Sequence, residues 1–183
     1  MVLFIDTHDE LITVALKVKD KLYIKEKESE YSHSIFTMPM IEELFNESKT
    51  DVKDLKKIIV VNGPGSFTGI RIGLSIAKTL AYALNIDINT ISSLTAYLIS
   101  NDEGKKRKAV IEDTKGYYIS AFDENNKPLF DEYYTHEDDV DLPCVEKKLS
   151  VDKIIDYCKD MPSENAHHVN ANYVKSIEVK YDK

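Results

Sequence analysis

The sequence has few of the residues that identify common classes of protein. It contains only two cysteines and two arginines among 183 residues. Cys144 and Cys158 form no CxxC pair and have no histidine at metal-ligand spacing, which favours idle thiols in a reducing compartment. No apolar run approaches the roughly 20 residues that span a bilayer, and the first residues lack the regions of a signal peptide. We therefore expect a cytoplasmic protein without a membrane segment.

Basic residues are also in the minority. The chain has 24 Lys and Arg against 32 Asp and Glu, so its net charge is −8. Binding to nucleic acid relies on clustered Lys and Arg that neutralise phosphates. The short basic clusters at 53–57 and 105–108 look like solvated loops or ends of elements. We expect no strong direct binding to nucleic acid, so that if RNA is involved, a partner makes most of the contact.

Glycine is scarce and unevenly distributed. Four of the six glycines lie between residues 63 and 73, and none follows Gly116. A nucleotide site of the sugar-kinase kind usually needs a glycine-rich adenosine loop in a second lobe, and this chain has no glycines there to build one. The glycine distribution therefore favours a packing surface over a nucleotide site.

The glycine-rich stretch is NGPGSFTGIRIGLSIAKTLAYA (62–83), which begins as a loop and continues as a helix. It is not a P-loop, because Thr68 stands where the second glycine belongs and no lysine follows. It also fails the dinucleotide fingerprint, because Gly69 comes one residue too late. The start of the helix can still bind an anion through backbone N–H groups, although Ser66 or Thr68 would more simply cap it.

Small residues recur every four positions along this helix, at Gly69, Gly73, Ala77 and Ala81. Glycine within a helix costs roughly 1 kcal/mol against alanine, so the stripe needs a compensating close approach. Two explanations stay open: another protein packs on this stripe, or the helix packs closely on its own sheet. If a partner packs on this stripe, we expect Gly73→Leu to abolish association with the partner and to leave the monomer folded. The adjoining faces supply apolar area from Ile70, Leu74, Ile76 and Leu80.

Apolar patterns predict an α/β fold. The expected strands are 2–6, 12–18, 22–28, 57–63 and 88–92, and the expected helices are 32–49, 66–84 and 93–100. Pro39 should kink or restart the helix that contains it. Three antiparallel strands followed by parallel additions make the ribonuclease-H-like order, with helices packed on a mixed sheet.

The pattern repeats more weakly after the polar stretch 101–108, which we take as a lobe boundary. This divides the chain into an N-terminal lobe, 1–101, which carries the helical interface, and a smaller C-terminal lobe, 102–183. The second lobe has expected strands at 108–113 and 117–123, a candidate third strand at 128–134 and a helix at 150–160. The tail, 171–183, has no clear pattern.

GPGSFTGIRIGLSIAKTLA (63–81) closely resembles the signature of the TsaB (YeaZ) family, the accessory subunits of tRNA threonylcarbamoyladenosine biosynthesis. The resemblance covers residues 1–122 well and the remainder poorly. Two departures are that His8 replaces a usual serine and that the second lobe is shorter than in most members. Further segments that resemble the family are FIDT (4–7), HSIFTMPMIEELF (33–45), ISSLTAYL (91–98), IEDTKGYYISAF (111–122) and ANYVK (171–175).

The resemblance implies an ASKHA-type fold of two ribonuclease-H-like lobes, the second one reduced. It also implies a non-catalytic subunit without a cofactor, which pairs with a TsaD-like catalytic subunit, or with a second copy when alone, and is joined by a TsaE-like ATPase. The pairing surface would be formed by the two helices of the first lobe. Its expected residues are His33, Phe36, Met40, Gly63, Pro64, Gly65, Ser66, Phe67, Thr68, Gly69, Ile70, Arg71, Gly73, Leu74 and Ala77.

An independent enzyme, either ATP-dependent or peptidase-like, is the alternative. In nucleotide-binding members of this fold, carboxylates placed like Asp6 and Asp113 position Mg²⁺ and water, although both could simply form turn and cap hydrogen bonds. TsaD-type subunits bind metal through two histidines at i and i+4, whereas His33 has a threonine four residues later. We therefore expect no metal. Arg71 is expected either to pair with a carboxylate of a partner or to be solvated.

Overall fold

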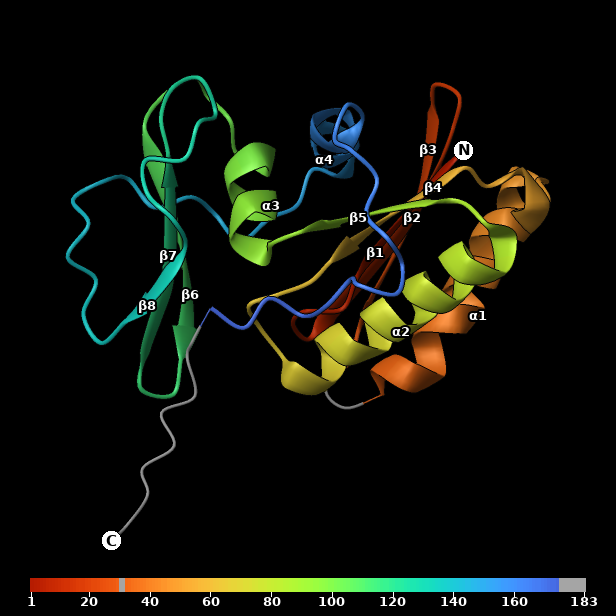
Figure 1. The fold of residues 1–183 in the computed structure, drawn as a ribbon, viewed down its shortest axis with the longest axis horizontal. Coiled ribbons are helices and arrows are strands. Elements are labelled where there is room, and N and C mark those ends of the chain that lie inside the picture. The colour runs from red at the N-terminus through yellow and green to blue at the C-terminus, as the bar shows by residue number, and fades with distance from the viewer. Residues whose placement is uncertain (30–31, 175–183) are drawn as a thin grey trace, which may run out of the picture.

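The computed structural model describes residues 1–29 and 32–174, which form two sheets with helices between and around them (Figure 1). Residues 175–183, the end of the expected C-terminal lobe and of the 171–175 resemblance, lie outside the described residues. The α/β fold with a mixed sheet that the sequence predicts is confirmed.

The first sheet has the strand order β3-β2-β1-β4-β5. Its strands are β1 (Val2–Asp6), β2 (Leu11–Val18), β3 (Lys21–Glu28), β4 (Lys57–Val61) and β5 (Asp87–Ile91). β1, β2 and β3 pair antiparallel, whereas β4 and β5 add parallel to β1. This is the predicted ribonuclease-H-like order. The buried strand β1 lies at the centre of this sheet. Ligand sites of α/β sheets are found beyond the carboxyl ends of such strands, so the carboxyl end of β1 is a candidate position for a site.

One face of this sheet is covered by α1 (His33–Ser48) and α2 (Phe67–Leu84), which lie side by side (Figure 1). Alternate residues of β1, including Leu3 and Ile5, join the apolar side chains of both helices in one core. Of the kink or restart predicted at Pro39, the restart is wrong, because α1 runs through this residue as one helix. The tertiary packing of its apolar stripe therefore outweighs the missing backbone N–H of the proline.

The opposite face of the first sheet packs against α4 (Val151–Cys158) and part of α3 (Ser93–Ser100). Phe4 lies between Leu3 and Ile5 on β1 and points to this second core, as the two-residue period of a strand requires. Its partners include Ile154 and Cys158 of α4, so Cys158 is a buried thiol. The helix predicted at 150–160 thus covers the first sheet.

The second sheet has the order β6-β7-β8 and is antiparallel throughout. Its strands are β6 (Arg107–Asp113), β7 (Gly116–Phe122) and β8 (Tyr133–Thr135), and α3 packs between it and the first sheet. The third strand predicted at 128–134 is mostly wrong. Residues 128–132 form only a single bridge, in which Pro128 pairs with Phe122. Regular pairing begins at Tyr133, where the chain reaches β7.

After α4 the chain returns to the first sheet as a segment without helix or regular strand, residues 162–173, which contains one turn and which we call the C-terminal strap (Figure 1). The Glu164 backbone N–H donates to β5, and Val169 is buried in the core with α2. The Asn172 N–H donates to the Asn62 carbonyl at 2.8 Å. The boundary placed near residue 101 therefore separates the two sheets, but the chain after residue 150 packs on the first one.

A search of the described residues finds no helix with both the length and the apolarity that crossing a membrane would require.

Candidate functional site

The small-residue stripe of α2 faces the interior of the chain. A Cβ atom at Gly69 would overlap the carbonyl oxygen of Thr7, and one at Gly73 would overlap the Thr7 hydroxyl. Ala77 and Ala81 continue this stripe into the core and are buried. The glycines therefore allow α2 to approach the end of β1 closely. Of the two explanations that the sequence left open, these contacts support close packing of the helix on its own sheet. Gly73→Leu would place its side chain against Thr7, so we now expect it to disturb the monomer itself.

The predicted interface residues divide into buried and accessible groups. The Thr7 hydroxyl donates to the Gly69 carbonyl at 2.7 Å, which shows how tightly the buried group is held. These buried residues can support a surface but cannot form it. They are His33, Met40, Gly63, Pro64, Gly69, Ile70, Gly73, Leu74 and Ala77. Phe36 is half-buried, and the exposed residues are Gly65, Ser66, Phe67, Thr68 and Arg71.

The outer face of α1 and α2 carries large exposed apolar side chains. Ile35, Phe67 and Tyr82 have exposed fractions of 64%, 56% and 69%. α2 has only two charged residues, and one of them, Lys78, donates to the Val169 carbonyl of the C-terminal strap at 2.8 Å. Depletion of charge together with exposed aromatic residues is typical of the centre of a protein interface. This outer face is the candidate docking face.

The turn between β1 and β2 fixes the loop that leads into α2. The Ser66 N–H donates to the His8 carbonyl at 2.6 Å, and the Ser66 hydroxyl caps α2 by accepting from the Gly69 N–H. On the other side of the turn, a ring nitrogen of His33 lies 2.7 Å from the Asp9 carbonyl oxygen. His33 therefore joins α1 to this turn, which gives a structural role to the histidine that the sequence placed in the interface.

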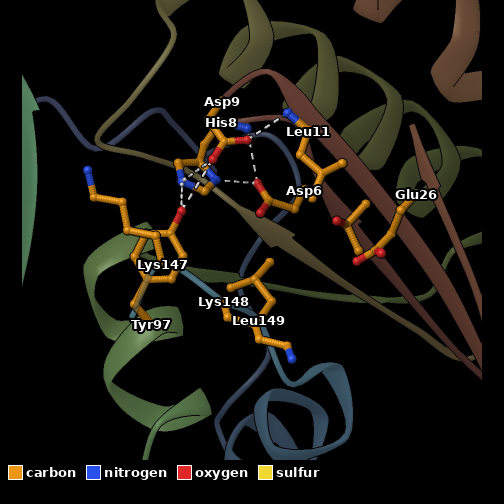
Figure 2. A pocket seen from close by; sticks show the side chains of 10 residues that line it. Asp6, His8, Asp9, Leu11, Glu26, Tyr97, Lys147, Lys148 and Leu149 are labelled. Carbon is orange, nitrogen blue, oxygen red and sulfur yellow. Dashed lines mark hydrogen bonds and ion pairs between the residues drawn. The ribbon is translucent and has the colours of Figure 1, made fainter. Parts of the chain in front are cut away.

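A cavity of about 250 Å³ lies at the carboxyl end of β1, on the face of the sheet opposite the docking face, next to α3 (Figure 2). His8 forms its back wall. Its Nδ1 lies 2.7 Å from an Asp6 carboxylate oxygen and its Nε2 lies 2.9 Å from the Tyr97 hydroxyl. The Tyr97 hydroxyl lies 3.3 Å from an Asp9 carboxylate oxygen. These four polar side chains thus form a continuous hydrogen-bonded network from the core to the cavity.

The electrostatics of this network favour a charged His8. Burial lowers the pKa of His8, but the charge and hydrogen bond of Asp6, together with the charge of Asp9, outweigh burial and raise it above 6.5. Burial and the two carboxylates raise the pKa of Tyr97 well above its usual range. Both ring nitrogens of His8 are already hydrogen-bonded, so His8 is not available as a free base. The network instead holds the β1–β2 turn against α3.

The cavity does not assemble the carboxylate pair that the enzyme alternative requires. Asp6 is engaged by His8, and Asp113 lies on the exposed end of β6, outside the residues that line the cavity. Among residues 1–29 and 32–174, no group of three or more His, Cys, Asp or Glu is arranged to hold a metal ion. The structure therefore does not bring Asp6 and Asp113 together at this cavity.

Sequence reasoning missed three residues that the structure places at these sites. In the sequence, His8 stands out only as a departure from the resembled family, although its position two residues after a strand-ending aspartate is a signal for the pair that it forms. Tyr97 was assigned only to an apolar helix, and its contact with His8 spans 89 positions of sequence. Tyr173 reaches α2 from the unassigned tail, which no local pattern could indicate.

The chain is similar to proteins of threonylcarbamoyladenosine biosynthesis. The family model described as TsaD, tRNA N6-adenosine threonylcarbamoyltransferase, matches residues 25–113. The tRNA threonylcarbamoyladenosine biosynthesis protein TsaB of Bacillus subtilis is 40% identical over 99 residues, or 51% of this chain and 41% of that protein. The protein of the same name from Buchnera aphidicola of Acyrthosiphon pisum is 28% identical over 158 residues, which cover 84% of this chain and 69% of the relative.

The fold comparison extends over nearly the whole chain. YeaZ from Pseudomonas aeruginosa superposes with a TM-score of 0.81 at 17% identity and covers 94% of this chain and 98% of that one. The B. subtilis match thus spans less than half of its relative, whereas the fold match spans almost all of YeaZ. The chain is thus similar to TsaB proteins in sequence and shares the fold of YeaZ.

Proposed function

We propose that this protein is a non-catalytic accessory subunit for the threonylcarbamoyladenosine modification of tRNA. It pairs with a TsaD-like catalytic subunit through the candidate docking face, the outer face of α1 and α2. The sequence similarity to TsaB proteins supports the pathway. The single observation that carries the pairing is the set of exposed apolar side chains on two adjacent helices, with only two charges on α2.

The same face accounts for the choice of partner. Residues 25–113, which include both helices, match the TsaD family model, so the catalytic partner carries a related segment. Two related helical pairs can pack face to face, as two copies of one chain do in an isologous dimer. The isolated chain then forms a homodimer through this face and exchanges into a heterodimer when the TsaD-like subunit is present. A TsaE-like ATPase joins that pair.

The charge of the chain is consistent with a supporting role. With a net charge of −8, it offers little attraction for tRNA, so the catalytic subunit makes most of the contact with RNA. Its effect on catalysis is conformational, because it stabilises the partner through the shared helical interface. This work takes place in the cytoplasm.

Size-exclusion chromatography with light scattering tests the proposal. The purified chain is run alone and with the TsaD-like protein of the same cell. We expect a homodimer alone and a 1:1 heterodimer in the mixture, with threonylcarbamoyl transfer to tRNA lower when this chain is left out. A chain that stays separate from the TsaD-like protein and does not change its activity contradicts the proposal.

The enzyme alternative has one observation in its favour, the cavity that contains Asp6 and His8. It predicts ATP hydrolysis or peptidase activity in the purified single chain, which disappears in Asp6→Ala. We expect no such activity above the level of the Asp6→Ala variant, because Asp6 is already bound to His8.

A further inference from the structure

The C-terminal strap ends on the docking face. Upstream of its end it is fixed at several points: Val169 is buried, and the Asn172 side-chain amide donates to Glu132 at 2.9 Å. Asn172 also donates its backbone N–H to the carbonyl of Asn62, just before α2. The next residue, Tyr173, therefore lies at the first turn of α2 and follows directly on an anchored segment.

Tyr173 forms a cluster with two exposed residues of α2. The Arg71 guanidinium lies over the Phe67 ring, with 3.7 Å between its central carbon and the ring centroid. The Arg71 Nε–H donates to the Tyr173 hydroxyl at 3.1 Å. The rings of Phe67 and Tyr173 have centroids 6.1 Å apart. One cation is thus held between two aromatic residues, and we call these three residues the arginine cluster.

The guanidinium of Arg71 keeps unused donors. Its Nε is hydrogen-bonded, but within residues 1–29 and 32–174 no carboxylate lies within ion-pair distance of it, and its two terminal nitrogens make no hydrogen bond. These terminal nitrogens form the planar pair that matches the two oxygens of a carboxylate. The flanking rings limit the motion of the side chain, so less rotamer entropy is lost when a partner binds.

We propose that the arginine cluster is the anchor of the docking face, and that it binds an aspartate or glutamate side chain of the TsaD-like partner. The C-terminal strap then belongs to the interface, because it supplies Tyr173. This inference rests on the proposed function and names the contact that determines the partner. Clusters of aromatic residues and arginine are the residues that most often dominate the affinity of protein interfaces.

The chemistry favours a carboxylate from another protein. The exposed part of α2 around Arg71 offers Thr68 and Ser75, which are neutral, so the guanidinium is the main charge on this part of the face. A carboxylate that approaches it meets apolar rings on both sides, which exclude water and strengthen the ion pair. A partner without an acidic residue at this point would leave the guanidinium desolvated and unpaired, which penalises the wrong partner.

Binding of the TsaD-like protein by calorimetry tests this proposal with four variants of the full chain. Arg71→Ala removes the cation and should weaken binding by about tenfold or more. Tyr173→Phe keeps the ring but removes the hydrogen bond to Arg71, and should weaken binding severalfold. Arg71→Lys should recover only part of the affinity, because an ammonium cannot form the planar pair. Tyr157→Phe is the matched control, since this half-exposed tyrosine lies on α4, on the other side of the sheet.

Raising the salt concentration provides a second readout. Affinity of the unaltered chain should fall with ionic strength, and this dependence should be smaller in Arg71→Ala. Thermal unfolding of each variant shows that the fold is retained. If the unaltered chain binds the partner and Arg71→Ala and Tyr173→Phe bind equally well, the inference is wrong and the proposed function stands. If Arg71→Ala weakens only self-association, the carboxylate belongs to a second copy and the inference is wrong. If the unaltered chain does not bind the TsaD-like protein, both this inference and the proposed function are wrong.

Discussion

At the scale of single residues, the approach of α2 to β1 depends on the absence of a side chain at Gly73. The Thr7 hydroxyl occupies the space that a Cβ would need, and Thr7 is fully buried. Helix propensity alone favours alanine over glycine by about 1 kcal/mol. Close packing in the core opposes this gain, because inserting atoms into a filled space costs about 1–3 kcal/mol.

We predict that Gly73→Ala lowers the free energy of unfolding by about 1–2 kcal/mol, despite the better helix propensity of alanine. Urea unfolding followed by circular dichroism measures this change. Ser75→Ala is the matched control on the exposed side of the same helix, and it should be neutral or slightly stabilising. A Gly73→Ala variant as stable as the unaltered chain would mean that Thr7 moves aside without cost.

His8 should give the stability of the protein a dependence on pH. Its pKa is raised above 6.5 in the folded state, by Asp6 and Asp9 against the opposing effects of burial and Lys147. The folded state therefore binds its proton more tightly than the unfolded state. This stabilisation is fully present below pH 6.5 and is lost as the pH rises through the folded-state pKa.

We predict that the free energy of unfolding falls as the pH is raised from 6 to 9, and that His8→Gln flattens this part of the profile. Urea unfolding at a series of pH values provides the measurement. His136→Gln serves as the control, because His136 is exposed and forms no ion pair among the described residues. Parallel profiles for the unaltered chain and His8→Gln would contradict the assignment.

At the scale of elements, the C-terminal strap and α3 are joined by the carboxylate of Glu132. One of its oxygens accepts from Ser92 and Thr95 at the start of α3, and the other accepts from Asn172. Burial raises the pKa of Glu132, although these hydrogen bonds lower it and offset part of the effect. A half-buried carboxylate with three donors therefore links the loop before β8 to both α3 and the C-terminal strap.

We predict that Glu132→Ala lowers the free energy of unfolding by about 1–3 kcal/mol, because three donors lose their acceptor. Amide hydrogen exchange should also become faster at Asn172, whose N–H is held by Asn62. Glu124→Ala is the control, because this residue is exposed on a nearby turn. Unchanged exchange at Asn172 would show that the other contacts of the C-terminal strap hold it in place without Glu132.

Element types could be predicted from the sequence wherever the apolar period was strong. β1 and β2 and the helix α2 fall within one or two residues of their expected ranges. The bounds of β8 could not be predicted, because within 128–134 regular pairing with β7 covers only Tyr133 and Tyr134, apart from the isolated bridge of Pro128. The contacts of the C-terminal strap could not be predicted either. Asn172 and Asn62 lie 110 positions apart in the sequence, and no periodic pattern of apolar residues relates them.

At the scale of the whole molecule, two sides of the first sheet have different characters. The docking face has the exposed side chains Ile35 and Tyr82, whereas the opposite side is closed by α4. We predict that Ile35→Glu and Tyr82→Glu each weaken association with the TsaD-like partner by tenfold or more, because each buries a charge at a helical interface. Light scattering of the mixture measures this change.

Both substitutions lie at exposed positions, so the free energy of unfolding should change by less than about 0.5 kcal/mol. Tyr157→Glu on α4 is the matched control, and it should leave association intact. Equal loss of association in all three variants would indicate a general effect of added negative charge on a chain that already carries −8.

The return of the C-terminal strap has a consequence for the order of events during synthesis. Helix α2 is complete once residue 84 has been made, but Val169, which fills the core beside it, and Tyr173, which lies on its first turn, are added about 90 residues later. A nascent chain therefore presents an unfinished face until these residues have been made. A partner that recognises the finished face can bind only after Tyr173 has been added, so products truncated before it lack the complete face.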